Sequence, residues 1–129
     1  MLTASELLAD LDHYYCTTQH YKHPFGLLYT DGVKALAMGG ECYWLIDAIA
    51  SYQPGKVIRA NPMLLEFQLW MLTVKEDHSA ALACYEDSPE TCEPVITQNI
   101  PNTNFVLPEI KLYKVGCYSY LLNIELNCL

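Results

Sequence analysis

Basic residues are scarce in this sequence. Lysine and arginine together number seven, against fifteen aspartates and glutamates, so the formal net charge is −8. The few basic residues do not cluster, and an acidic surface repels the phosphate backbone of nucleic acids. We therefore expect no nucleic-acid partner. A small molecule, or a protein with a basic face, suits this charge better.

Long apolar runs and familiar catalytic motifs are also missing. No stretch approaches the roughly 20 apolar residues that span a bilayer. The first eleven residues lack the basic start of a signal peptide, so we expect a cytoplasmic protein without membrane contact. The sequence contains no GxxxxGK[ST], GxGxxG or GxSxG motif, and we predict no cofactor.

Cysteine is present six times, but no two cysteines form a CxxC pair. A zinc knuckle or a thioredoxin-type redox site would need that spacing. In a reducing cytosol, free thiols are the default state of unpaired cysteines. The sequence therefore predicts neither a disulfide framework nor a structural metal.

Apolar residues, by contrast, make up 52% of the 129 residues, enough for one packed core. We expect a single domain over residues 1–129. The patterns predict an α+β fold, with two helices in the N-terminal half packed on a mostly antiparallel sheet of about five to six strands.

Helix signals concentrate in the first half of the chain. Thr3 and Glu6 form a capping-box pattern, which predicts a helix that ends before Pro24. Residues 41–53 form a second, largely apolar helix, ended by a Pro-Gly pair. Between them, Asp31-Gly32 indicates a hairpin within residues 25–38, although its second arm could instead be helical.

Strand signals fill the second half. Residues 64–74 are apolar at both alternating sets of positions, which predicts a central strand covered on both sides. Further strands are expected at residues 80–85, 95–100, 110–115 and 118–126.

Several segments resemble an uncharacterised domain-of-unknown-function family of bacterial, phage and plasmid proteins. The segments are YTDGVK at 29–34, YWLIDAIAS at 43–51, FQLW at 67–70, QNIPNTNFVL at 98–107 and IKLY at 110–113. The resemblance spans about residues 13 to 113. It implies an intracellular protein of bacterial or mobile-element origin, and it implies no activity and no catalytic residues.

Cys42 is the most interesting candidate for chemistry. It lies at the start of the predicted helix 41–53, and a helix N-terminus favours the thiolate. His78 follows later in the chain, in the order found in papain-like and transglutaminase-like enzymes, and Glu86 or Asp87 could orient its imidazole. The alternative is a buried core cysteine and a solvated histidine, and Glu41 beside the thiol opposes thiolate formation.

Four other metal-binding side chains lie close together, at His13, Cys16, His20 and His23. Imidazole and thiolate suit zinc, but four ligands along one straight helix would span about 15 Å. At most His20 and His23 could share an ion with a neighbour. A polar helix face explains the pattern equally well, and we predict no metal site.

A small-ligand site is a further hypothesis. Asp47 and Ser51 form the one polar stripe of the helix 41–53, and Gln68 and Trp70 lie in the predicted central strand. Four acidic residues flank the Ser88-Pro89 turn and indicate a solvated surface: Glu86, Asp87, Glu90 and Glu93.

Ten tyrosines and two tryptophans exceed what a core of this size needs. Tyrosine and tryptophan are enriched at protein interfaces, because they bury a large area and keep a polar group. Our leading hypothesis is a non-enzymatic binding or accessory protein that acts through protein–protein contacts, as a monomer or homodimer. The alternative is a cysteine hydrolase or transferase that uses Cys42 and His78.

Overall fold

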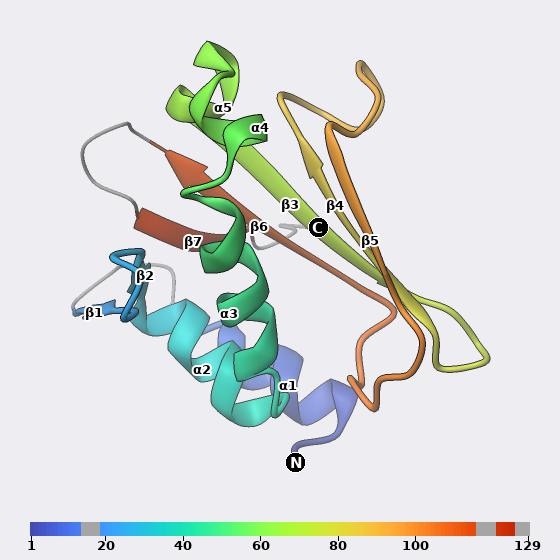
Figure 1. Cartoon of the computed structure of the whole chain (residues 1–129). Coiled ribbons are helices and arrows are strands. Elements are labelled where there is room, and N and C mark those ends of the chain that lie inside the picture. The colour runs from blue at the N-terminus through green and yellow to red at the C-terminus, as the bar shows by residue number, and fades with distance from the viewer. Residues whose placement is uncertain (14–18, 116–120, 126–129) are drawn as a thin grey trace.

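The computed structural model describes residues 1–13, 19–115 and 121–125, and it has the α+β fold that the sequence predicts (Figure 1). The helices of the described residues are α1 (Ala4–Leu11), α2 (Asp31–Gly39), α3 (Tyr43–Tyr52), α4 (Lys56–Arg59) and α5 (Pro62–Glu66). The strands are β1 (His20–Lys22), β2 (Leu28–Thr30), β3 (Phe67–Val74), β4 (Ala80–Tyr85), β5 (Ile96–Ile100), β6 (Glu109–Val115) and β7 (Leu121–Glu125).

All of these strands join one sheet in the order β1-β2-β7-β6-β3-β4-β5. Every neighbouring pair is antiparallel except β2 and β7, which are parallel. The mostly antiparallel sheet is therefore confirmed. Two short strands extend it at one edge: β1, which the sequence did not predict, and β2, which overlaps the first arm of the hairpin expected within residues 25–38.

The hairpin expected within residues 25–38 is wrong. The Asp31-Gly32 pair starts α2 instead of turning the chain, because the hydroxyl of Thr30 accepts a hydrogen bond from the amide of Val33 at 3.3 Å. Threonine at an N-cap satisfies one of the free amides of the first helical turn. The alternative that the second arm is helical is confirmed.

The first helix has the predicted start. Its capping box is present, with Thr3 and Glu6 bonded reciprocally, and the helix runs from Ala4 to Leu11. The prediction that it ends before Pro24 is therefore confirmed. Residues 20–22 form β1, which pairs with β2.

The predicted strand 64–74 begins three residues late. Asn61 caps α5 by accepting hydrogen bonds from the amides of Met63 and Leu64, and Pro62 suits the first helical turn. The strands predicted at residues 80–85, 95–100 and 110–115 correspond closely to β4, β5 and β6. In the last expected strand Leu122 is buried as predicted, while residues 118–120 and 126 lie outside the described residues.

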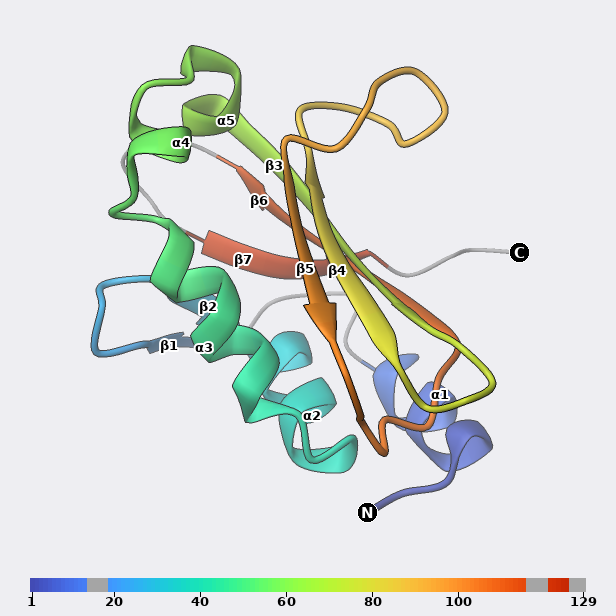
Figure 2. The same ribbon diagram turned by 45° about the vertical axis from the view of Figure 1, so that its right-hand side comes forward.

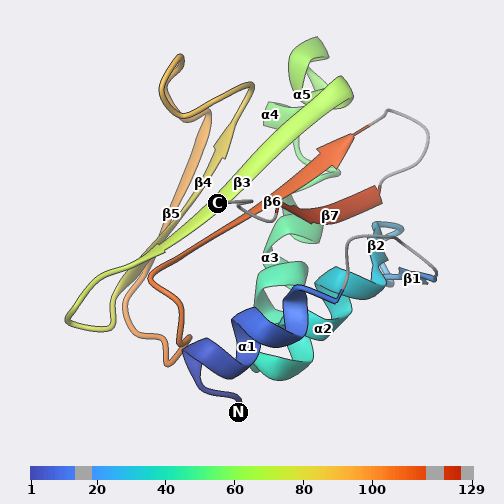
Figure 3. The ribbon, with the colours of Figure 1, turned by 180° about the vertical axis from the view of Figure 1, so that it is seen from behind.

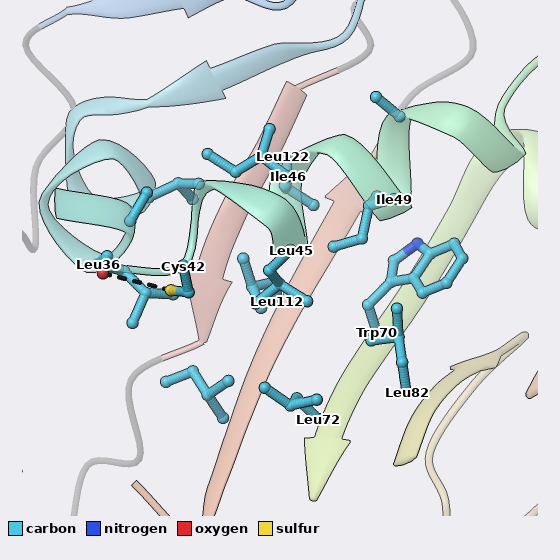
Figure 4. Packing of buried hydrophobic residues seen from close by; sticks show 14 of the residues in the cluster. Leu36, Cys42, Leu45, Ile46, Ile49, Trp70, Leu72, Leu82, Leu112 and Leu122 are labelled. Carbon is cyan, nitrogen blue, oxygen red and sulfur yellow. Dashed lines mark hydrogen bonds between the residues drawn. The ribbon is translucent and has the colours of Figure 1, made fainter. Parts of the chain in front are cut away.

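The main core lies between α3 and one face of the sheet (Figure 2). Leu45, Ile46 and Ile49 of α3 pack toward Trp70 and Leu112 of the sheet, as Figure 4 shows. We call this side the covered face; its sheet residues are Trp70, Leu72, Leu82, Leu112 and Leu122. The prediction that α3 is buried against a sheet is confirmed.

The opposite side of the sheet, which we call the open face, carries Leu69, Met71, Ala83, Tyr85 and Tyr113. No helix among the described residues crosses it (Figure 3). The prediction that β3 is a central strand is confirmed, and among the described residues a helix covers one of its two faces. Leu69 is nevertheless buried, because the side chains of Ala83 and Tyr85 on β4 pack beside it.

The turn between α2 and α3 requires a glycine at position 40. A Cβ atom there would lie 2.7 Å from the Phe105 ring and 3.0 Å from the carbonyl oxygen of Leu36. Gly40 thus lets the segment around Phe105 pack closely against the end of α2.

Candidate functional site

The β1–β2 hairpin and the outer face of α3 together form an aromatic surface. The rings of Tyr21 and Tyr29 stack with their centroids 5.7 Å apart, and the ammonium of Lys34 lies 4.1 Å from the centre of the Tyr21 ring. Burial raises the pKa of Tyr29, and the neighbouring Tyr43 of α3 raises it further. Tyr43 remains 44% exposed, so this surface offers a ring to solvent.

One hydrogen bond holds the hairpin to the helix. The Nε2 atom of His23 lies 2.7 Å from Oδ1 of Asp47, whose side chain is 69% exposed. We define the hairpin–helix surface as Tyr21, His23, Tyr29, Tyr43 and Asp47.

A groove of about 480 Å³ continues from Tyr43 along the end of α2. It is lined by Ala37, Met38, Glu41, Tyr43 and Trp44. Met38 is 59% exposed, which leaves a long flexible apolar side chain at the surface. Glu41 gives the groove an acidic edge, so the apolar and aromatic atoms are flanked by negative charge.

Cys42 lies immediately before α3, as the sequence predicted, but its thiol points into the core (Figure 4). The side chain is 1% exposed, and Sγ donates to the carbonyl oxygen of Leu36 at 3.5 Å. Burial raises the pKa of Cys42 to about 12. A thiolate nucleophile needs a shift in the opposite direction.

His78 and Asp87 occupy two exposed turns of the sheet. His78 has a φ of 67° in the β3–β4 turn, and its carbonyl oxygen accepts a hydrogen bond from the amide of Thr103 at 2.8 Å. Asp87 follows β4 in the segment that leads to β5. No hydrogen bond among the described residues links Cys42, His78 and Asp87, so the catalytic hypothesis stays a prediction.

The histidines and cysteine considered for metal binding do not share one helix. His13 follows α1, His20 lies in β1, and Cys16 lies outside the described residues. Within the described part of the chain, no three His, Cys, Asp or Glu side chains lie close enough to hold an ion. His23, the fourth residue, contacts the carboxylate of Asp47.

The four residues of the ligand hypothesis separate into two pairs. Asp47 and Ser51 lie on the exposed side of α3, where the Ser51 hydroxyl donates to the carbonyl oxygen of Ala48 at 2.6 Å. Gln68 and Trp70 are buried on the covered face, and Trp70 Nε1 donates to Gln68 Oε1 at 2.9 Å. α3 lies between the pairs, so the structure does not bring all four together.

Gln53, at the end of α3, completes the buried pair instead. Its amide and the amide of Gln68 donate to each other's oxygens, both at 2.9 Å. Gln53 Nε2 also donates to Ile49, and Gln68 Nε2 donates to the carbonyl oxygen of Leu64. In this amide cluster both side-chain amide nitrogens use all of their hydrogens, which fixes the end of α3 against β3.

A pocket of about 490 Å³ opens beside the amide cluster. It lies among the end of α3, α4, α5, β6 and the segment before β2, and it is lined by Phe25, Leu27, Gln53, Pro54, Ile58, Arg59, Leu65 and Lys114. Lys114 is only 2% exposed. Its neighbour in the register of the sheet is Gln68, so the lysine and the amide cluster lie side by side.

Membership of a family follows from comparison of the whole sequence. A family of unknown function, DUF6876, matches residues 5–123. The chain belongs to DUF6876. No curated protein matches the chain, and no solved structure matches it. The DUF6876 match covers every element from α1 to the middle of β7, including both the hairpin–helix surface and the pocket.

Sequence reasoning missed three polar residues of this DUF6876 chain, namely Gln53, Arg59 and Lys114. No sequence pattern marked Arg59 and Gln53, because only the tertiary structure brings their segments to β6. The position of Lys114, in contrast, could be read from the sequence. Ile110 and Leu112 alternate inward on β6, and the same parity carries Lys114 onto the covered face.

The described residues include no helix that is both long and apolar enough to cross a membrane.

Proposed function

We propose that this DUF6876 protein is a non-enzymatic binding protein that acts through protein–protein contacts, with the hairpin–helix surface and the adjoining groove as its contact site. The observation that carries this proposal is Tyr43. It is an exposed ring shared by an aromatic surface and a groove, with Met38 exposed beside it. Interfaces are enriched in tyrosine and methionine relative to other surfaces.

Charge defines the chemistry of the partner. Asp47 and Glu41 are exposed on either side of Tyr43, and the whole chain carries a net charge of −8. Complementary charge steers association and fixes orientation. The partner is therefore a protein with a basic surface and an apolar side chain that enters the groove at Met38. A cytoplasmic setting and a bacterial or mobile-element origin belong to this proposal, and both rest on the sequence alone.

Site-specific photo-crosslinking in the native host tests the proposal. The crosslinker p-benzoylphenylalanine replaces Tyr43 in one variant and Val95, 37% exposed before β5, in a control variant. We expect one or a few discrete protein adducts from position 43 and none of these from position 95. The captured protein should be basic at its crosslinked surface, as mapped by mass spectrometry.

Charge reversal provides the second readout. Asp47→Lys should reduce the yield of the adduct from position 43 several-fold, because it removes the complementary charge. Asp77→Lys, in the exposed β3–β4 turn, is the matched control and should leave the yield unchanged. Equal adducts from positions 43 and 95, or an adduct that ignores Asp47→Lys, would contradict the proposal.

The cysteine hydrolase hypothesis has less support, because burial raises the pKa of Cys42 instead of lowering it. Alkylation by iodoacetamide at pH 7.5, read by peptide mass spectrometry, separates the two hypotheses. A binding protein should leave Cys42 and Cys84 unmodified under conditions that label the half-buried Cys92. Rapid labelling of Cys42 would restore the enzyme hypothesis.

A further inference from the structure

We propose that the pocket among α3, α4, α5 and β6 binds a small organic anion with an apolar body. None of its lining residues belongs to the hairpin–helix surface or to the groove beside it, although Phe25 at the rim contacts His23 of that surface. Its volume of about 490 Å³ lies in the range of about 300–1,000 Å³ that is typical of small-molecule sites.

Two positive charges line the pocket at different depths. Lys114, with 2% of its surface exposed, lies at the floor, and Arg59 of α4 is exposed at the rim. The lining contains no aspartate or glutamate. Two of the seven basic residues of a chain with a net charge of −8 thus meet in one concavity. An anion is the ligand that such a lining attracts.

The position of Lys114 in the sheet is unusual for a structural lysine. The inward positions of β6 otherwise hold Ile110 and Leu112, and a leucine or methionine at 114 would continue this apolar face. Removing an ammonium from water is costly, so lysines are among the residues least often buried. Natural proteins depart from the inward apolar pattern mainly at functional sites.

Apolar side chains form the rest of the wall. Leu27 and Ile58, each 2% exposed, lie at the floor with Lys114, and Phe25 is 66% exposed at the rim. The two positive charges alone would also attract inorganic phosphate. The leucine, isoleucine and phenylalanine side chains of the lining favour a ligand that also has an apolar body. Burial of that body contributes roughly 25 cal/mol per Å² of apolar surface.

Gln53 restricts the ligand further. Both hydrogens of its amide nitrogen are already donated, to Ile49 and to Gln68, while its oxygen accepts one hydrogen bond from the described residues, that of Gln68. A carbonyl oxygen has two lone pairs, so Gln53 can accept one more hydrogen bond but cannot donate one. The acid group of the ligand must therefore be met by Lys114 and Arg59, and a hydroxyl or amino group is accommodated at Gln53.

Fluorescence titration of the full chain with 8-anilinonaphthalene-1-sulfonate tests the inference, because this probe combines a sulfonate with an apolar body. N-phenyl-1-naphthylamine, which lacks the sulfonate, is the uncharged comparison. We expect saturable binding of the sulfonate with one site per chain, and at least tenfold weaker binding of the uncharged probe. Binding of the sulfonate should also weaken as the salt concentration rises.

Variants assign the binding to the pocket. Lys114→Met should weaken the affinity for the sulfonate about tenfold, and Arg59→Gln about threefold, because the exposed arginine is screened by solvent. Lys111→Met is the matched control on the same strand. It points to the open face, where its ammonium lies 3.8 Å from Glu109, and it should leave the affinity unchanged. Arg59→Gln changes an exposed side chain, so it tests the site even if Lys114→Met fails to fold.

Competition identifies the acid group. Octanoate, octyl phosphate and 1-octanol are each titrated against the bound sulfonate probe. Displacement by octanoate alone assigns a carboxylate, displacement by octyl phosphate alone assigns a phosphate ester, and displacement by both supports the shared anion chemistry. In all three cases the side-chain amide signal of Gln53 in the nitrogen–proton NMR spectrum should shift.

Four results would each overturn the inference. The first is that the uncharged probe binds as tightly as the sulfonate. The second is that Arg59→Gln and a folded Lys114→Met both bind the sulfonate with the affinity of the parent chain. The third is displacement of the probe by octanol as effective as that by the two anions, and the fourth is that neither probe binds.

Discussion

The two faces of the sheet carry different kinds of structure. The covered face packs against α3 and continues into the polar cluster of Gln53 and Gln68 and the pocket at Lys114. The open face holds a small cluster centred on Leu69, Ala83 and Tyr85, and no helix among the described residues lies over it. Side chains that alternate along β3 therefore meet two environments.

This difference between the faces shows that the main core and the buried polar groups lie on the same side of the sheet. Trp70 is fully buried on the covered face, while its neighbour Met71 is half-buried on the open face. The same face that stabilises the fold also holds a buried lysine and a bonded amide pair. The predictions below test how unequal the faces are.

The largest expected difference is between Trp70→Ala and Met71→Ala. Removing the buried indole should lower the free energy of unfolding by about 4 kcal/mol, because a cavity forms in the main core and the bond to Gln68 is lost. Met71→Ala should lower it by about 1 kcal/mol. Urea unfolding followed by far-ultraviolet circular dichroism measures both. Equal losses would mean that the open face is covered in solution.

Alkaline pH should destabilise the fold through two buried thiols of the main core. Burial raises the pKa of Cys42 and of Cys84 to about 12, whereas a thiol in the unfolded chain titrates near about 8.5 to 9. Between these values the folded state keeps protons that the unfolded chain loses, so stability falls as the pH rises. From pH 8 to pH 10 the two thiols together should lower the free energy of unfolding by about 3 kcal/mol.

Urea unfolding under reducing conditions at both pH values measures this loss. The double variant Cys42→Ala/Cys84→Ala should lose most of the thiol contribution to the pH dependence. Cys92→Ala, in the open-face cluster, should retain it. If the double variant depends on pH as steeply as the parent chain, the two thiols are not protonated by burial.

A smaller effect is expected from the amide cluster. Gln68→Ala should lower the free energy of unfolding by about 2 kcal/mol, because it leaves the buried Trp70 Nε1 and the Gln53 amide without their partner. Gln98→Ala is the matched control on β5. It loses one bond from the Tyr52 hydroxyl, at a half-buried position that water can reach, and should cost under about 1 kcal/mol. Thermal unfolding ranks the two variants, and the reverse order would contradict the importance of the cluster.

The smallest expected loss of stability comes from removing the N-cap of α2. Thr30→Ala removes the buried N-cap of α2 and should cost about 1 kcal/mol. Thr30→Ser keeps the hydroxyl and serves as the control, with most of the stability retained. Denaturant midpoints compare the two, and an identical loss in both would show that the methyl group matters and the cap does not.

Much of the fold could be predicted from the sequence because its local signals agree. The apolar helix around Ile46 and Ile49, the strands β4 to β6 and the capping box at Thr3 all follow from periodicity and hydrogen-bonding chemistry. The errors occur where two local signals compete. Asp31-Gly32 suits both a turn and the first turn of a helix, and the capping hydroxyl of Thr30 decides for the helix.

Much less of the candidate sites could be predicted. The position of Cys42 before α3 was legible, but the direction of its thiol depends on the packing of α2 and on the carbonyl of Leu36. Lys114 could have been recognised from its inward parity on β6. Its approach to Arg59 and Gln53 could not, because these residues come from segments about 55 to 60 positions away in the sequence.

By itself, the sequence determined the α+β class, the acidic charge and the course of most central elements, since all of these depend on composition or on contacts within a few residues. Only the tertiary structure decided which face of the sheet is covered, that Asp47 of α3 bonds to His23 of the β1–β2 hairpin, and that Lys114 and Arg59 line one pocket. These features arise from contacts between distant segments, whose pairing is set by the packing of α3 on the sheet and not by any local pattern.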